Sequence, residues 1–144
     1  GKTGVMGSVV RGAVDSGGWT GGSNVPHIIK LEGLPDGLSS FWLRPDIYTR
    51  MEIMIERSDA FVIFPGGAGT LQELLALLLL LEAGDPLMKN KPIVVFDRID
   101  KSGNRFWTPL IKLMEENNYS SFFTVVDELD QIIPTVHRLI NQNS

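Results

Sequence analysis

The chain has 144 residues and a mass of 15.9 kDa, enough for one domain with a hydrophobic core but too little for two. Its 13 basic and 17 acidic residues give a net charge of -4, which does not indicate the basic surface that nucleic acids or anionic membranes attract. Because cysteine is absent, a disulfide scaffold, a thiolate zinc site and a cysteine nucleophile are excluded, and with only His27 and His137 a histidine metal site is not expected.

The ends and the apolar runs of the chain bear on its location. The longest apolar run, Leu74–Leu81, is much shorter than the roughly 20 residues of a membrane span, and no signal peptide is recognised. We therefore expect a cytoplasmic protein with no membrane partner. The chain begins with Gly1-Lys2-Thr3-Gly4, inside a glycine-rich turn of the kind that follows a strand, so we expect an N-terminal segment to be missing.

The first part of the chain alternates short β-rich runs with helical ones. Apolar residues at helical spacing predict a helix over Val5–Ser16, ended by Gly17-Gly18, and a turn-rich stretch follows over Trp19–Pro26. The remaining predicted elements of this part are strands at His27–Leu31 and Phe41–Leu43 and a helix from Pro45 to about Arg57.

The second part continues the alternation. The predicted elements are a buried strand at Ala60–Phe64, a turn at Pro65–Gly69, a helix from Thr70 to about Ala83, a buried strand at Pro92–Phe96, a helix over Phe106–Asn117, a short strand at Phe122–Val126, and a final helix capped by Asp127 and reaching Ile140. Strands that alternate with helices predict an α/β fold with a doubly wound parallel sheet and helices on both faces. Ligands of such folds bind at the carboxyl ends of the strands.

The most informative motif is the run Phe64–Glu73, FPGGAGTLQE, between a buried strand and a helix. Glycines at Gly66, Gly67 and Gly69 allow a tight turn and close approach of a ligand, and Thr70 adds a hydroxyl donor. The free amides at the helix start favour an anion such as phosphate. The motif is neither a Walker A loop, since no lysine follows the last glycine, nor the dinucleotide fingerprint. A plain strand-to-helix turn is the alternative interpretation.

Two charged residues are candidates for chemistry near this loop. Glu73 lies about one turn into the helix, where a carboxylate could act as a general base or stabilise a developing cation. It could instead be an acid favoured by the helix dipole. Arg50 precedes the Ala60–Phe64 strand and could orient Glu73 or bind phosphate. The alternative interpretation is that Arg50 lies on a solvent-exposed helix face together with the neighbouring glutamates.

A second glycine-rich element, Gly1-Lys2-Thr3-Gly4-Val5-Met6-Gly7, also stands at a predicted helix start. It could hold another part of the ligand, although alone it is a weak signal. Farther along, Leu74–Leu81 is apolar around the whole helix, so that helix must be covered on every side. Core burial accounts for one face, and we expect a subunit interface to cover the other.

These motifs together resemble one known family. Pro65–Glu73 matches the pattern P-G-G-x-G-T-x-x-E without gaps, and Arg50 stands at the arginine of an M-H-x-R-K context. Gly4-Val5-Met6-Gly7 resembles the family's G-L-M-G turn. The sequence is therefore similar to the LOG family of nucleotide 5'-monophosphate ribohydrolases, which includes the cytokinin riboside 5'-monophosphate phosphoribohydrolases and is also described as possible lysine decarboxylases. Tyr48 and Met51 replace the family's His and Lys, and the Trp19–Pro26 stretch stands where the family runs directly into a strand.

The resemblance covers nearly the whole chain and implies a single Rossmann-like nucleotide-binding domain over residues 1–144, usually a homodimer. It also implies that about one strand and one helix are absent at the front. By resemblance, Arg50 and Glu73 are the catalytic pair. Further by resemblance, the substrate-binding residues are Gly4, Met6, Gly66, Gly67, Gly69 and Thr70. No metal and no organic cofactor is implied.

The reaction implied is hydrolysis of the N-glycosidic bond of a nucleoside 5'-monophosphate, such as AMP or a cytokinin riboside monophosphate, to free base and ribose 5-phosphate. Lysine decarboxylation is rejected, because no lysine lies at the glycine loop and the chain is short for a pyridoxal enzyme. A carrier that binds a nucleotide or a phosphorylated cofactor without hydrolysing it remains an alternative. A purely structural homodimerising domain is a further one.

Overall fold

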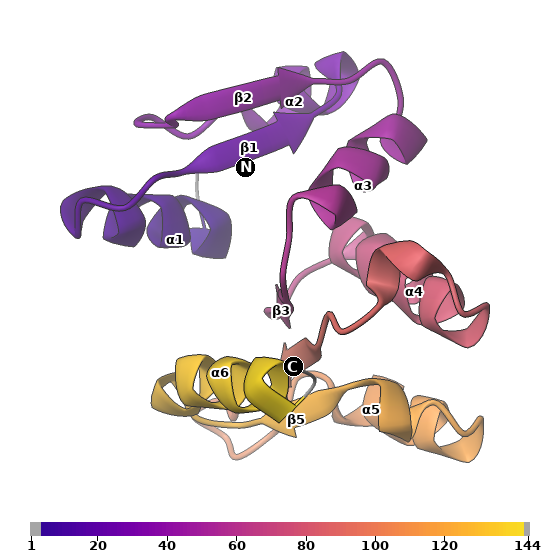
Figure 1. Cartoon of the computed structure of the whole chain (residues 1–144). Coiled ribbons are helices and arrows are strands. Elements are labelled where there is room, and N and C mark those ends of the chain that lie inside the picture. The colour runs from indigo at the N-terminus through magenta and orange to yellow at the C-terminus, as the bar shows by residue number, and fades with distance from the viewer. Residues whose placement is uncertain (1–3, 143–144) are drawn as a thin grey trace. The chain divides into compact units, whose positions relative to one another are not determined.

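The computed structural model describes residues 4–142, whose elements are drawn in Figure 1. Gly1, Lys2 and Thr3 of the first glycine-rich element lie outside the described residues. The chain divides into two compact units, one up to Arg57 and one from Ser58 onward, and each is described by itself.

The first unit combines three helices with a pair of parallel strands. Its elements are α1 (Gly4–Asp15), β1 (Gly21–Asn24), α2 (Pro26–Glu32), β2 (Ser40–Leu43) and α3 (Ile47–Glu56). Gly21 of β1 stands opposite Ser40 of β2, and Asn24 stands opposite Leu43. Figure 1 shows the two strands side by side, pointing the same way. The helices predicted over Val5–Ser16 and from Pro45 to Arg57, and the strand predicted at Phe41–Leu43, are confirmed with small changes at their ends.

The strand predicted at His27–Leu31 is wrong, because these residues form α2. Pro26 occupies the first turn of this helix, where its fixed φ suits the helix and its missing N–H is not needed. The helix stops at Gly33, whose positive φ of 70° favours glycine. The strand of this region is β1, inside the stretch Trp19–Pro26 that the sequence had indicated to be turns.

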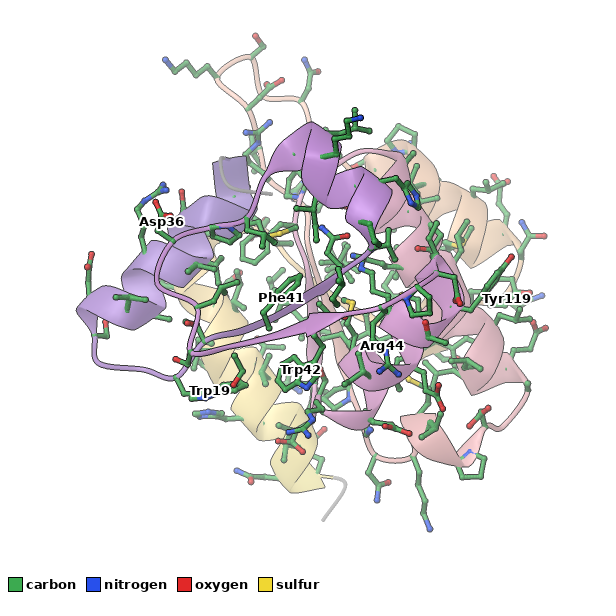
Figure 2. All side chains as sticks on the ribbon, turned by 90° about the horizontal axis from the view of Figure 1, so that it is seen from above. Trp19, Asp36, Phe41, Trp42, Arg44 and Tyr119 are labelled. Carbon is green, nitrogen blue, oxygen red and sulfur yellow. The ribbon has the colours of Figure 1, made fainter. Side chains whose placement is uncertain are left out.

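Packing of aromatic rings explains why a strand begins with glycine. A Cβ atom on Gly21 would lie 2.5 Å from the Trp19 ring and 2.8 Å from the Trp42 ring. The two indole rings have centroids 5.9 Å apart, and Figure 2 shows them next to each other. The Arg57 guanidinium lies 4.9 Å from the Trp42 ring centroid, at the end of α3. This stack requires glycine at position 21, which overrides the low strand propensity of that residue.

The second unit contains a three-stranded parallel sheet and three helices. Its elements are β3 (Phe61–Ile63), α4 (Ala68–Glu82), β4 (Ile93–Phe96), α5 (Thr108–Glu116), β5 (Thr124–Val126) and α6 (Ile132–Gln142), with short 3-10 turns at Pro86–Met88, Ser120–Phe122 and Leu129–Gln131. The strand order is β3-β4-β5. Ile63, Val95 and Val125 lie level across the three strands.

The core of the second unit lies around β4, all four residues of which are buried. Ile132 and Val136 of α6 pack against Val94 and Phe96 of β4 and against Val126 of β5. Figure 1 shows α6 running beside β5. The buried strand predicted at Pro92–Phe96 is thus confirmed, and it is the central strand of this sheet. The run Ala60–Phe64, whose apolar character had indicated the covered centre, instead forms β3 at the edge of the three strands, where only Ile63 is buried.

The prediction that Asp127 caps the final helix is wrong. Helix α6 begins only at Ile132, and Glu128 caps the 3-10 turn Leu129–Gln131 that leads into it: the Glu128 side chain accepts from the backbone N–H of Gln131, while the Gln131 side chain accepts from the Glu128 backbone N–H at 3.3 Å. This reciprocal arrangement needs a long side chain three residues after the cap, which Gln131 supplies. Asp127 instead forms an ion pair with Arg105, with 3.0 Å between Asp127 Oδ2 and an Arg105 terminal nitrogen.

Within residues 4–142, parallel strands in two small sheets and six helices confirm the predicted α/β class and are consistent with a Rossmann-like fold. Across the same residues, the helices are too short or too polar to cross a bilayer.

Candidate functional site

The three parallel strands of the second unit end on the same side of the sheet, and the segments that follow them meet there. Because Ile63, Val95 and Val125 are level, the loop that starts at Pro65, the side chain of Asp97 and the side chain of Asp127 follow three neighbouring strand ends. The ladder continues one step past β4, where the Asp97 N–H donates to the Val126 carbonyl at 2.8 Å. Neighbouring strands are about 4.8 Å apart, so these segments lie within reach of one small ligand.

The loop after β3 leads directly into the N-terminus of α4. Gly67 is the residue before the helix, and none of the described side chains caps it. The amides of the first turn therefore lack side-chain acceptors, although Leu71 N–H closes the first helical turn onto the Gly67 carbonyl at 3.1 Å. An anion placed here would meet these N–H groups and the positive end of the dipole of a 15-residue helix.

The three glycines of the loop serve different needs. A Cβ atom on Gly66 would overlap Thr70 Oγ1 and lie 3.0 Å from Thr70 Cβ, so glycine is required there by the fold. The absence of a side chain at Gly66 leaves room for the Thr70 hydroxyl beside the loop. By contrast, Gly67 and Gly69 have open space where a Cβ would stand. Gly69 costs α4 up to about 1 kcal/mol relative to alanine, and no neighbour demands it. Room for a ligand to approach the backbone accounts for this choice.

Glu73 is the sixth residue of α4 and is half-buried. It follows Gly69 by four positions and Thr70 by three, which places these residues on one face of the helix. The first turn of α4 contains no acidic residue, and the helix dipole acts mainly within that turn. The alternative that Glu73 serves only the dipole is therefore weakened. Its position supports a carboxylate that faces the space beside the glycine loop.

The other predicted site residues belong to the first unit. Arg50 lies in α3 and is half-buried. The helix is capped by Asp46, whose carboxylate accepts from Thr49 N–H at 2.9 Å, and Arg44 Nε donates to the Thr49 carbonyl at 3.2 Å. These contacts fix the turn of α3 that precedes Arg50. Since Arg50 and Glu73 belong to different units, their pairing stays a prediction.

Gly4 and Met6 lie at the start of α1. Gly4 has a positive φ of 71° and open space around the position of a Cβ, while Met6 is exposed. Glycine at position 4 is thus explained by the backbone conformation that starts the helix. Substrate contact by either residue stays a prediction.

Sequence analysis missed a buried carboxylate at the end of β4. Asp97 is 2% exposed and accepts hydrogen bonds from the Trp107 backbone N–H and from Thr108 Oγ1, the latter at 2.9 Å. It thereby joins the end of the strand to the start of α5, which begins at Thr108 rather than at Phe106 as predicted. An acidic residue directly after a buried apolar strand was the available signal.

The segment between Asp97 and Trp107 forms a small hairpin, which we call the 98–106 hairpin. Ile99 and Arg105 form an antiparallel bridge, and Phe106 N–H donates to the Arg98 carbonyl at 3.1 Å. The hairpin turns at Asp100, whose Oδ1 accepts from the backbone N–H groups of Ser102 and Asn104, each at 2.9 Å. The ion pair between Arg105 and Asp127 ties the hairpin to the segment after β5. Among residues 4–142, no cluster of histidine and carboxylate side chains is arranged to hold a metal ion.

The fold and the site together define a parallel α/β protein with a glycine-rich loop between strand β3 and helix α4. Residues 6–141 match the family model described as possible lysine decarboxylase. The chain belongs to this family, which is the LOG family that the motifs had indicated.

Curated relatives carry one name. The cytokinin riboside 5'-monophosphate phosphoribohydrolase of Rhodococcoides fascians is 30% identical over 124 residues, which cover 85% of this chain and 59% of that protein. The Mycobacterium tuberculosis protein of that name is 40% identical over 75 residues, covering 51% of this chain and 40% of that protein. The probable cytokinin riboside 5'-monophosphate phosphoribohydrolase LOGL1 of Oryza sativa subsp. japonica is 27% identical over 150 residues, covering 99% of this chain and 60% of that protein. The chain thus spans 40–60% of the length of these relatives.

Proposed function

We propose that the protein hydrolyses the N-glycosidic bond of a nucleoside 5'-monophosphate to a free base and ribose 5-phosphate. AMP and a cytokinin riboside monophosphate are the proposed substrates. Membership of the family and the names of the relatives support the class of reaction. The observation that carries the proposal within this chain is the placement of Glu73, one turn beyond an open glycine loop and outside the range of the helix dipole.

The proposed mechanism begins with the phosphate. The N–H groups of the loop at Gly66, Gly67 and Gly69 bind it, together with the Thr70 hydroxyl, and so fix the ribose. Binding energy from the phosphate then supports chemistry at C1' of the sugar. Because phosphate contact and reaction occur at different atoms, variants of the loop and of Glu73 should affect different kinetic constants.

The C1'–N bond breaks with both electrons leaving to the base, which takes up a proton, and positive charge develops on the ribose ring. The Glu73 carboxylate stabilises this charge and accepts a proton from the water whose oxygen attacks C1'. Glu73 then releases this proton to solvent and solvent supplies the one that the base takes up, so the carboxylate is regenerated. Arg50 binds the substrate and holds Glu73 in its ionised form. Gly4 and Met6 contact another part of the same nucleotide.

We further propose that both units belong to one Rossmann-like nucleotide-binding domain, and that the protein is a cytoplasmic homodimer. Leu75 and Leu79 are exposed on α4, at positions four apart on one helix face. An apolar pair of this kind supports a second copy of the chain as the partner that covers α4.

The test is chromatography of AMP, GMP, CMP, UMP and an N6-modified AMP after incubation with full-length protein. We expect free base and ribose 5-phosphate from the wild type. Glu73→Gln should lower kcat by about 10²–10⁴-fold and leave nucleotide binding largely intact, because the amide cannot accept the proton. The matched control is Glu116→Gln, which changes an exposed glutamate of α5 in the same way and should keep full activity.

Two results would contradict the proposal. Intact nucleotides that nevertheless bind, as measured by calorimetry, would establish the carrier alternative. Unchanged turnover in Glu73→Gln would remove Glu73 from the mechanism even if the hydrolysis itself is observed.

A further inference from the structure

The strongest unassigned feature of the second unit is an exposed aromatic ring near the carboxyl ends of its strands. We call this side of the sheet, where the glycine loop, Asp97 and Asp127 follow the strands, the ligand edge. Phe106 ends the 98–106 hairpin and is 43% exposed, although it lies next to the buried Trp107. Single exposed apolar residues are ordinary on protein surfaces. Phe106 differs from such residues because three separate contacts of the described structure fix its place.

The first contact is between rings. The centroids of Phe106 and Trp107 are 4.6 Å apart and their planes are perpendicular, which is a favourable edge-to-face geometry. Trp107 is only 4% exposed, and its indole N–H has no hydrogen-bond partner within the described part of the chain. Trp107 therefore acts as a packed apolar support for its neighbour rather than as a polar anchor.

The second and third contacts hold the backbone on both sides of the ring. Asp97 accepts from the Trp107 N–H, and the Phe106 N–H donates to the Arg98 carbonyl. A ring with a supported edge and a fixed backbone loses little conformational entropy when a ligand packs on it. Phe106 is therefore preorganised to contact a flat partner.

The position of this ring relates it to the glycine loop. Asp97 follows β4 directly and is level with Pro65, the residue at which the loop after β3 begins. The backbone of Trp107 is bonded to Asp97, so Phe106 lies at the surface beside the same sheet edge. A ligand whose phosphate occupies the loop would carry its remaining groups past this edge.

We propose that Phe106 is the surface on which the nucleobase of the substrate stacks, with the 98–106 hairpin and Asp97 holding the ring in place. This inference rests on the proposed function, since it takes a nucleoside 5'-monophosphate as the ligand. A planar base suits an aromatic ring because every base presents a π face, and such stacking accepts more than one base. Phe106 thereby favours a nucleotide over ribose 5-phosphate, which carries the phosphate and the sugar alone.

The experiment compares the binding of AMP and of ribose 5-phosphate by calorimetry in the Glu73→Gln background, where turnover is expected to be slowed by about 10²–10⁴-fold. Phe106→Ala should weaken AMP binding by about 5- to 150-fold, the range found when a base loses its aromatic partner. Binding of ribose 5-phosphate should not change. Phe106→Tyr should retain AMP affinity, while Phe106→Leu, which keeps apolar bulk without a π face, should lose most of it.

Ile99→Ala is the matched control, because Ile99 lies on the same hairpin with 44% exposure and does not support the ring. It should bind both ligands as the parent protein does. Thermal unfolding of each variant checks the fold, and Phe106→Leu keeps the test decisive if Phe106→Ala does not fold.

Several outcomes would overturn the inference: equal loss of AMP and ribose 5-phosphate binding in Phe106→Ala, parent-like AMP affinity in Phe106→Leu, or a parent protein that binds AMP no better than ribose 5-phosphate. Failure of the proposed function is a separate result. If the wild type hydrolyses no nucleotide but its AMP affinity depends on the Phe106 ring, the stacking site stands and the hydrolase does not.

Discussion

Among residues 4–142, some glycines are required by close contact and others by their backbone conformation. Gly66 and Gly21 both lack a positive φ, yet a larger residue is disfavoured at each because another side chain occupies the space of its Cβ. At Gly69 that space is open, and the helix carries a glycine without a structural need. These positions look alike in the sequence and differ only in their surroundings, so their substitutions should have opposite effects.

We predict that Gly66→Ala destabilises the fold and that Gly69→Ala does not. In Gly66→Ala the new methyl group collides with Thr70, which should lower the free energy of unfolding by about 1–3 kcal/mol. Gly69→Ala should raise it by up to about 1 kcal/mol through helix propensity, while weakening nucleotide binding by filling the open space. Denaturant unfolding and AMP calorimetry measure both effects. Adding Thr70→Ala to Gly66→Ala should restore part of the loss; no recovery would mean that Thr70 is not the obstacle.

Tyr119 provides a prediction about pH. Its hydroxyl donates to Glu82 Oε2 at 3.0 Å, and this hydrogen bond, with the negative charge of Glu82, raises the pKa of Tyr119 above its usual 10.0. Only the neutral phenol can donate. The stability that the bond contributes is therefore fully present below pH 10.0 and is lost as the pH rises through the raised value.

The stability difference between wild type and Tyr119→Phe should accordingly be constant below pH 10.0 and shrink above it. Unfolding by denaturant at a series of pH values measures the difference. Glu82→Gln keeps an acceptor oxygen but removes the charge, so the loss should begin at lower pH in that background. If the stability difference between wild type and Tyr119→Phe is the same below and above pH 10.0, the hydrogen bond does not form in solution.

At the scale of elements, alternation of strands and helices could be predicted because buried strands are continuous apolar runs. Ile93–Phe96 is of this kind, with all four residues buried, whereas in the equally apolar Phe61–Ile63 only Ile63 is buried. Strand β1 and helix α2 could not be predicted, since Ile28 and Ile29 have high strand propensity whereas Gly21 and Gly22 have low strand propensity. The outcome was decided by Pro26, which starts a helix, and by rings that pack over Gly21. Packing between residues distant in sequence therefore outweighed the local strand propensity.

The 98–106 hairpin is an element held by its ends and by one ion pair. We predict that Arg105→Ala loosens it with little effect on the whole fold. Both side chains of the Arg105–Asp127 pair are more than a third exposed, so its loss should lower the free energy of unfolding by no more than about 1 kcal/mol. Backbone amides of Ile99 and Arg105 should exchange hydrogen faster, as measured by mass spectrometry.

The same pair has an internal control. Asp127→Asn should speed exchange as much as Arg105→Ala, and the double variant should add nothing further, because either change removes the same interaction. Raising the salt concentration of the wild type should move exchange in the same direction. Additive effects of the two substitutions would assign the protection to other contacts.

For the molecule as a whole, the loop at Pro65–Glu73 could be predicted because its residues are contiguous in the sequence. The second half of the ligand edge could not, since Asp97, Trp107 and Asp127 come from separate segments and meet only through strand register. Asp97 shows no motif, and its partners are a backbone N–H and a hydroxyl that no pattern specifies. The sequence motif thus indicated the phosphate loop and Glu73, whereas the residues beside the loop could be found only from the strand order and register of the structure.

The outer face of α4 leads to a prediction for the assembly. Leu75 and Leu79 are 46% and 63% exposed, while Leu74, Leu77 and Leu78 of the same helix are buried. Helix propensity alone does not call for leucine at solvent positions, because glutamate or lysine would serve equally well there. A second copy of the chain packed on this face would remove both leucines from water. Because each is about half exposed, each would stabilise the pair by about 1–2 kcal/mol, which is roughly half the value for burying a fully exposed leucine.

We therefore predict a dimer whose mass falls to that of one chain in the Leu75→Glu/Leu79→Glu variant, as measured by sedimentation velocity. Two buried carboxylates without partners would cost more than the interface gains. Leu113→Glu is the control, because Leu113 is 51% exposed on α5 and should leave the mass unchanged. Circular dichroism should show the same helix content in all three proteins, since the substitutions lie at exposed positions. A wild type that sediments as one chain would contradict the prediction, and the apolar face of α4 would then require a different partner.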